Sequence, residues 1–180
     1  DSVGIIGLGP IGLMFIKLAK LKGARVIAAG RSPMKLQLAK DFGGADEVVD
    51  LNKYKNPEKI FKDFSSEKRG LDIAVECVGL PEVWEQMFSY VRKGGTVHLF
   101  GGCKSGSKVC IDTTKLHYDG IKVVSVFHHT PMYIREALRL IYEEKLPVEK
   151  LITETMPLER TEEALIKQMN GRAVKILIKP

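Results

Sequence analysis

The glycines near the start of the chain constrain its fold more than any other feature. An apolar run at residues 3–6 ends in the pattern Gly7-x-Gly9-x-x-Gly12, and apolar residues then recur at helical spacing. A strand, a tight turn and a helix in this order are typical of a βαβ unit that holds a dinucleotide. Gly7 permits the turn, Gly9 lets the main chain approach a pyrophosphate, and Gly12 lets the helix pack closely on the strand. We expect the phosphates at the amino end of the helix, and a glycine-rich turn without a ligand is the alternative.

Strand-like and helix-like segments alternate along most of the chain. After the first strand, apolar segments of strand length are expected at residues 25–29, 47–50, 71–76, 96–100 and 122–127. Helices are expected between them, and a further helix over residues 131–144. This alternation predicts an α/β fold, a three-layer, Rossmann-type, doubly wound parallel sheet of about six strands.

The pattern changes near residue 151. A strand at residues 151–156, a helix near 159–169 and a strand at 173–178 predict a C-terminal helix–strand appendage to the six-stranded unit. We therefore expect a dinucleotide-binding domain over residues 1–150 and a separate segment over residues 151–180. Because the chain opens directly on its first strand, we interpret it as part of a longer protein.

Charge and cysteine content narrow the range of partners. The net charge is +6, but lysines and arginines alternate with acids along the helices, which is typical of a solvated surface with some bias toward an anionic cofactor. We expect no nucleic acid partner, and no membrane span because no apolar run approaches about 18 residues. Three cysteines without a CxxC pair (Cys77, Cys103 and Cys110) and no signal peptide before the first strand predict a cytoplasmic protein with free thiols.

The loop after the second strand is expected to set the choice of cofactor. Ligands of open α/β sheets lie beyond the carboxyl ends of the strands. A carboxylate about 20 residues past the glycines would bind the adenosine ribose 2′-hydroxyl and select NAD. This sequence has Gly30 there, followed by Arg31 and Ser32, and a guanidinium with a hydroxyl suits a 2′-phosphate. We therefore favour NADP over NAD, with a solvated Arg31 in an NAD-binding protein as the alternative.

No side chain of this sequence is predicted to be catalytic or to bind a metal. The adjacent His128 and His129 at a strand end point to different sides, so they chelate a single metal poorly. His98 lies within a strand, where we expect a core residue with a hydrogen-bond partner. Asp72 and Glu76, both on the fourth strand, are expected to serve local hydrogen bonding.

Four segments of the sequence resemble one protein family. They are the Gly-x-Gly-Pro-x-Gly turn at residues 7–12, Cys77-Val78-Gly79, the run Lys-Gly-Gly-Thr-Val at residues 93–97 and the closing residues 171–180. In this order, and over essentially the whole chain, they resemble the zinc-dependent medium-chain dehydrogenase/reductase family. The branch resembled includes alcohol, sorbitol and threonine dehydrogenases, whereas the quinone reductase branch typically has another glycine pattern.

The resemblance implies one extended dinucleotide site along the carboxyl ends of the strands. The implied residues, grouped by the part of the cofactor they meet, are Gly9, Pro10, Ile11 and Gly12 at the pyrophosphate, with Gly7 in the turn itself; Arg31 and Ser32 at the adenosine ribose; Cys77 and Val78 on the adenine side; Phe100 and Gly101 at the nicotinamide and its ribose; Val126 and His128 at the carboxamide; and Lys175 near the pyrophosphate.

The resemblance also implies what this chain lacks. In the family, the zinc ligands and the proton relay come from a GroES-like domain that precedes the first strand, and the C-terminal segment packs on that domain. We expect this chain to be the NAD(P)(H)-binding domain of a zinc-dependent alcohol or polyol dehydrogenase, inactive alone and forming a homo-oligomer. The whole oxidoreductase would transfer a hydride between a secondary alcohol or polyol and nicotinamide. A non-catalytic nucleotide-sensing Rossmann domain and an S-adenosylmethionine-dependent methyltransferase are the alternatives.

Overall fold

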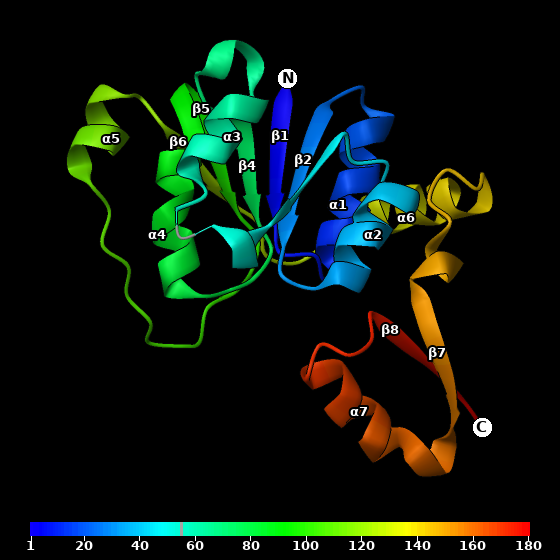
Figure 1. Cartoon of the computed structure of the whole chain (residues 1–180). Helices are drawn as coiled ribbons and strands as arrows, with labels where there is room; N and C mark the ends of the chain where they lie inside the picture. Colours follow the sequence, from blue (N-terminus) through cyan, green and yellow to red (C-terminus); the bar gives the residue numbers. More distant parts are fainter. Residues whose placement is uncertain (55) are drawn as a thin grey trace. The chain divides into compact units, whose positions relative to one another are not determined.

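The computed structural model describes residues 1–54 and 56–180. The chain forms two compact units, Asp1–His129 and Thr130–Pro180. The first unit contains a six-stranded sheet with the strand order β3-β2-β1-β4-β5-β6, in which all neighbouring strands are parallel (Figure 1). The strands are β1 (Ser2–Ile6), β2 (Arg25–Gly30), β3 (Glu47–Asp50), β4 (Leu71–Glu76), β5 (Val91–Leu99) and β6 (Lys122–Ser125). This topology confirms the predicted doubly wound α/β fold.

Helices connect these strands. They are α1 (Pro10–Leu21), α2 (Pro33–Asp41), α3 (Glu58–Phe64), α4 (Pro81–Tyr90) and α5 (Thr113–Tyr118), with single 3₁₀ turns η1 (Leu51–Lys53) and η2 (Ser66–Lys68). Prolines occupy the first helical position of α1, α2 and α4, where the missing N–H has no helical partner in any case. Within the described part of the chain, none of the helices combines the length and the apolar character that a membrane crossing requires.

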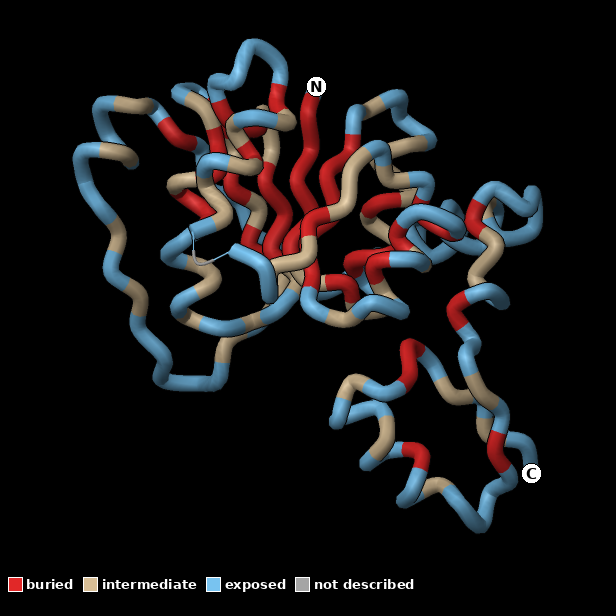
Figure 2. Tube along the Cα trace, viewed as in Figure 1, coloured by how far each residue is buried: buried red, intermediate tan, exposed pale blue. Residues whose placement is uncertain are grey.

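The central strands are buried on both faces. Along β2, Ile27 and Ala29 belong to the same apolar cluster as Phe61 of α3 and Met87 of α4. Val26, equally buried, points to the opposite face because side chains alternate along a strand. Figure 2 shows that the buried residues of this unit concentrate along the strands of the sheet. Near-continuous apolar runs are what a parallel sheet covered on both faces requires.

The start of β5 and the end of β6 differ from the predicted boundaries. β5 begins at Val91, which pairs with Leu71, and the register then shifts so that Ile73 pairs with Thr96. The residues between form a bulge that contains Gly94 at a φ of +69°. β6 ends at Ser125, before the predicted end at residue 127.

The second unit contains the predicted strand–helix–strand appendage. It consists of α6 (Pro131–Tyr142), η3 (Val148–Leu151), β7 (Ile152–Pro157), η4 (Leu158–Arg160), α7 (Thr161–Met169) and β8 (Lys175–Lys179), and β7 pairs with β8 in parallel. The helix α6, which has no buried residue, is grouped with this compact unit, and the division into domains at residues 1–150 and 151–180 stays a prediction. Burial is a property of packing, which the alternation of elements along the sequence does not report.

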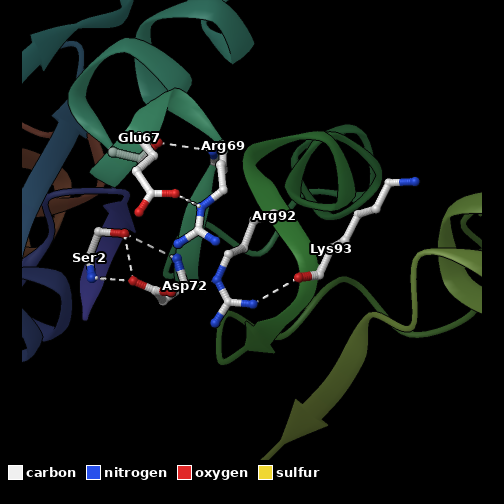
Figure 3. A network of polar contacts seen from close by, with 8 residues as sticks. Ser2, Glu67, Arg69, Asp72, Arg92 and Lys93 are labelled. Atoms are coloured by element: carbon white, nitrogen blue, oxygen red, sulfur yellow. Dashed lines mark hydrogen bonds and ion pairs between the residues drawn. The ribbon is translucent and has the colours of Figure 1, made fainter.

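An acidic residue joins three segments at the amino ends of β1 and β4. The Asp72 carboxylate accepts hydrogen bonds from the Ser2 main-chain N–H (2.7 Å) and hydroxyl (2.9 Å), and from Arg92 Nε (2.6 Å), as Figure 3 shows. The Ser2 hydroxyl in turn accepts a hydrogen bond from the Asp72 N–H (3.1 Å). Burial alone would raise the pKa of Asp72, but the bonds from Ser2 and Arg92 outweigh it and lower the pKa to about 2. The prediction of local hydrogen bonding at Asp72 is confirmed.

This network predicts a stability effect that depends on pH. Asp72→Asn removes a charge-assisted acceptor, and we expect a loss of about 1–2 kcal/mol of unfolding free energy at pH 7, allowing for solvent screening. Because the folded pKa lies below the ordinary value of 3.8, the contribution is present above pH 3.8 and is lost as the pH falls toward 2. Urea unfolding at pH 7 and at pH 3 measures the loss of unfolding free energy and its dependence on pH. Asp63→Asn, at an exposed residue of α3, is the control. A difference between wild type and Asp72→Asn that is the same at both pH values would contradict this assignment.

Candidate functional site

A cavity of about 380 Å³ opens at the carboxyl ends of β1, β2 and β4. The strand order reverses between β1 and β4, and ligands of doubly wound sheets lie at such a reversal. Five of the residues predicted for the site, Gly7, Gly9, Arg31, Ser32 and Val78, line this one cavity. The structure therefore brings together three loops that lie far apart in the sequence.

The three glycines of the turn are required for different reasons. Gly7 has a φ of +99°, a conformation that L side chains rarely adopt, and its N–H donates to the Ala29 carbonyl (3.0 Å). A methyl group on Gly12 would lie 1.9 Å from the Gly7 carbonyl oxygen, so α1 packs on the turn only with glycine there. A methyl group on Gly9 would meet nothing within 4 Å. The fold explains Gly7 and Gly12, and it leaves Gly9 without a structural reason.

The amino end of α1 fits a bound phosphate. Gly9 is its N-cap residue, no side chain caps the helix, and its first turn carries no acid. Pro10 has no N–H, so the groups directed out of the helix end belong to Gly9, Ile11 and Gly12. These N–H groups and the positive end of the helix dipole favour an anion. The cradle above Gly9 therefore fits the pyrophosphate of a dinucleotide.

The loop after β2 carries the positive charge of Arg31, and a hydrogen bond from Asn52 holds its main chain in place. Gly30 pairs in register with Asp50 of β3, so an acid does stand beside the loop. Its carboxylate, however, accepts hydrogen bonds from the N–H (3.0 Å) and the amide nitrogen (2.9 Å) of Asn52. The same Asn52 amide donates to the Arg31 carbonyl (2.7 Å) and so fixes the loop. The Arg31 side chain is left exposed at the cavity.

Sequence reasoning missed two charged residues of this cavity. Lys35, in the first turn of α2, lines it together with Arg31, and so does Glu82 of α4. Lys35 follows Arg31 by four residues, which is the spacing that brings side chains to one face of a helix. That spacing was the available signal, although Arg31 itself lies just before the helix begins. Among the described residues, the lining thus carries two positive side chains, Arg31 and Lys35, and one negative one, Glu82.

Glu76 connects the loops after β4 and β5. Its carboxylate accepts hydrogen bonds from the Val78 N–H (2.6 Å), the Gly79 N–H (2.9 Å) and the Trp84 indole (3.0 Å), which confirms the predicted local hydrogen bonding. Burial raises the pKa of Glu76 above its ordinary value, and these three bonds act against that rise. Burial and the Glu76 charge also raise the pKa of Cys77 to about 12, so this thiol is no nucleophile at neutral pH.

The remaining predicted residues lie outside the lining of the cavity. Cys77, Phe100 and Gly101 follow β4 and β5 at the same edge of the sheet, and Pro10, Ile11 and Gly12 open α1. Val126 and His128 come after β6, and His128 has a φ of +74° with its ring against Phe127. Lys175 opens β8 in the second unit. The carboxamide and Lys175 assignments therefore stay predictions.

His98 differs from its prediction. Its ring packs edge-on against Phe15 and Phe100, with centroids 5.8 and 6.1 Å apart, as a core residue would. Its buried Nε2, however, has no hydrogen-bond partner among the described residues, so the expected partner is wrong. Burial lowers the pKa of His98, and the neutral ring then packs as an aromatic side chain.

The described residues offer no constellation that fits a metal ion. Within residues 1–54 and 56–180, no group of three or more His, Cys, Asp or Glu side chains could hold one. The described cysteines are all free. The residues present therefore fit a dinucleotide and do not fit a zinc ion.

Comparison with known proteins gives a consistent set of relatives. A family model described as zinc-binding dehydrogenase matches residues 10–143. D-arabinitol dehydrogenase 1 from Uromyces fabae is 31% identical over 177 residues, which cover 98% of this chain and 50% of that protein. Benzyl alcohol dehydrogenase from Acinetobacter calcoaceticus has a TM-score of 0.89 at 27% identity, over 99% of this chain and 49% of that one. A provisionally identified zinc-binding dehydrogenase from Sinorhizobium meliloti 1021, bound to NADP, has a TM-score of 0.91 at 29% identity, over 100% and 52% of the two chains.

The chain spans about half the length of the curated relatives it matches. The family match covers more than half of the chain, and it includes the helix that follows the glycine turn, the loop after β2 and the Glu76 segment. By these matches and by its fold, the chain belongs to the zinc-dependent medium-chain dehydrogenase/reductase family.

Proposed function

We propose that this chain binds NAD(P)(H) and is the coenzyme-binding part of a zinc-dependent alcohol or polyol dehydrogenase. The observation that carries the proposal is the open space above Gly9, where an added Cβ would meet no protein atom within 4 Å. That space lies at the uncapped amino end of α1 and beside the positive loop at Arg31. An anionic ligand explains why the turn keeps glycine where the fold does not require it.

In this proposal the residues of the chain bind and orient the cofactor. The N–H groups at the start of α1 hold the pyrophosphate, the loop after β2 holds the adenosine ribose, and the loops after β4 and β5 direct the other half of the molecule. When bound, the nicotinamide accepts or donates the hydride. Polyol and alcohol substrates are supported by the relatives, which include D-arabinitol and benzyl alcohol dehydrogenases. The zinc ion would be held by residues outside this chain.

We further propose NADP as the preferred cofactor. Arg31, Ser32 and Lys35 present a guanidinium, a hydroxyl and an ammonium to one cavity, a set that suits a phosphate. The structural neighbour from Sinorhizobium meliloti is bound to NADP. Glu82 on the same lining is the feature that opposes this preference.

The proposal also concerns the domain on which this chain packs, its oligomeric state and its compartment. We propose that residues 151–180 pack on a GroES-like catalytic domain, that the whole protein is a cytoplasmic homo-oligomer, and that it binds neither nucleic acid nor a membrane. The three free cysteines support a reducing compartment. Family membership counts against a methyltransferase, whereas a nucleotide-sensing domain without a catalytic half remains the second candidate.

The glycine turn gives a test that separates ligand binding from folding. Gly9→Ala adds a methyl group to open space at a φ of −71°, so we expect unfolding free energy within about 1 kcal/mol of wild type. The same methyl group would lie where the pyrophosphate approaches, and we expect dinucleotide affinity to fall by about tenfold or more. Gly12→Ala should instead destabilise the fold, because its methyl group meets the Gly7 carbonyl. Urea unfolding and calorimetric titration measure the two effects, and unchanged affinity in Gly9→Ala would refute the pyrophosphate site.

The choice of cofactor gives a second test. In Arg31→Asp the new carboxylate would repel a 2′-phosphate and suit a 2′-hydroxyl. We expect NADP⁺ affinity to fall by about 10–100-fold while NAD⁺ affinity holds or rises. Lys40→Asp makes the same charge change on α2 outside this cavity and should leave the ratio of the two affinities unchanged. Wild-type binding of NADP⁺ no tighter than of NAD⁺, with Arg31→Asp without effect, would overturn the NADP preference.

A further inference from the structure

We propose that Glu76 is a positioning residue that holds two loops of the dinucleotide site at a set distance from each other. One is the loop after β4, whose Val78 lines the cavity, and the other is the loop after β5, with Phe100 and Gly101. The inference rests on the proposed function. It assigns Glu76 a role beyond local hydrogen bonding, namely the spacing between the two halves of the cofactor.

Glu76 contacts both loops with different parts of the same residue. Its Oε1 accepts from the N–H groups of Val78 and Gly79, which hold the first loop. Its main-chain carbonyl accepts from the N–H groups of Phe100 (3.1 Å) and Gly101 (3.0 Å), which hold the second. A single residue at the end of β4 therefore fixes where both loops begin.

Trp84 of α4 closes this arrangement. Its indole Nε1 lies 3.0 Å from Glu76 Oε2 and also 3.0 Å from the Gly101 carbonyl oxygen, so one N–H bridges the carboxylate and the second loop. Trp84 is itself partly buried against the core cluster, which limits its movement. The two loops are thus joined through the side chains of Glu76 and Trp84 as well as through the main chain.

The loops after β4 and β5 pack against each other so closely that neither Gly79 nor Gly101 has room for a side chain. A methyl group on Gly101 would lie 2.5 Å from the Gly79 nitrogen and 2.6 Å from Glu76 Oε2. A methyl group on Gly79 would lie 2.6 Å from the Gly102 carbonyl oxygen, and Gly79 has a φ of +81°. Main chain meets main chain directly, so a change in the length or the bonding of the Glu76 side chain must move one loop relative to the other.

Burying the Glu76 carboxylate costs free energy, which supports a role for this residue beyond packing. The Glu76 side chain is fully buried, and no Lys, Arg or His is paired with it in the described part of the chain. Isolated buried acids are costly unless hydrogen bonds satisfy them, and an apolar residue would avoid that cost. Among the described residues, the groups that donate to this carboxylate are the main-chain N–H groups of the loop after β4 and the Trp84 indole N–H, which also reaches the loop after β5.

The test compares a whole dinucleotide with its adenosine half. Glu76→Gln keeps the shape of the side chain but turns an NH₂ group toward one of these N–H donors, so at least one hydrogen bond to Val78, Gly79 or Trp84 is lost. Calorimetric titration of the 180-residue chain would use NADP⁺ and, as the half-ligand, adenosine 2′,5′-bisphosphate, with NAD⁺ and AMP in parallel. We expect Glu76→Gln to weaken the whole dinucleotide by about tenfold and the half-ligand by less than about threefold.

Two further variants keep the proposal testable if Glu76→Gln folds poorly. Trp84→Phe removes only the bridging N–H and should give the same selective loss, about three- to fivefold for the whole dinucleotide. Glu85→Gln on the same helix also alters a carboxylate that accepts a main-chain N–H, that of Cys110 (2.7 Å), and should leave the ratio of affinities unchanged.

Equal losses for both ligands, or no loss for either, in Glu76→Gln and Trp84→Phe would overturn the positioning role and leave the proposed function intact. Failure of the wild-type chain to bind any of the four ligands would overturn the proposed function, and the inference with it. A selective loss for the whole dinucleotide is the one result that supports the inference.

Discussion

The contact between Gly12 and the Gly7 carbonyl oxygen is the constraint on which the rest of the site depends. With any side chain at residue 12, α1 could not approach the turn after β1, because the first carbon would lie 1.9 Å from that oxygen. This approach sets the amino end of α1 at the carboxyl edge of the sheet, where the strand order reverses. The uncapped helix end then faces the space above Gly9. The proposed anion site thus depends on a steric requirement of the fold.

The two acids of β4, Asp72 and Glu76, differ in their surroundings. Asp72 stabilises the fold at the amino end of the strand, and Glu76 lies beside the proposed dinucleotide site at its carboxyl end. Asp72 is paired with Arg92 and with both polar groups of Ser2, and its pKa is lowered to about 2. At the other end of the strand, burial raises the pKa of Glu76, whose carboxylate accepts hydrogen bonds from the N–H groups of Val78, Gly79 and Trp84. The bonds from Ser2 and Arg92 stabilise the ionised form of Asp72 and connect β4 to β1 and β5. At Glu76, burial disfavours the ionised acid, and hydrogen bonds from the loops that border the proposed site offset part of that effect. Acids with pKa values shifted in this way often lie at functional sites.

The sequence predicted the features that depend on local pattern. Strand and helix periods, prolines at helix starts and the glycine turn gave the six-stranded parallel sheet, because each reports the conformation of its own segment. The bulge that begins β5 at Val91 was not predictable, since it depends on pairing with Leu71 of another strand. Lys35 was missed although its four-residue spacing from Arg31 was a local signal. That the buried Nε2 of His98 has no partner among the described residues depends on packing between distant segments. The meeting of the loops after β1, β2 and β4 at one edge was predictable from the parallel topology, whereas pairing and packing between distant side chains were not.

The central claim is that the amino end of α1 binds the pyrophosphate of a dinucleotide. Its most direct test is a two-dimensional ¹H–¹⁵N spectrum of the ¹⁵N-labelled chain during titration with NADP⁺. The account predicts that the amide signals of Gly9, Ile11 and Gly12 shift most, together with those of the loop at Arg31, and saturate at a single dissociation constant. Shifts confined to other segments, or signals at the start of α1 that stay unchanged at saturating NADP⁺, would contradict it.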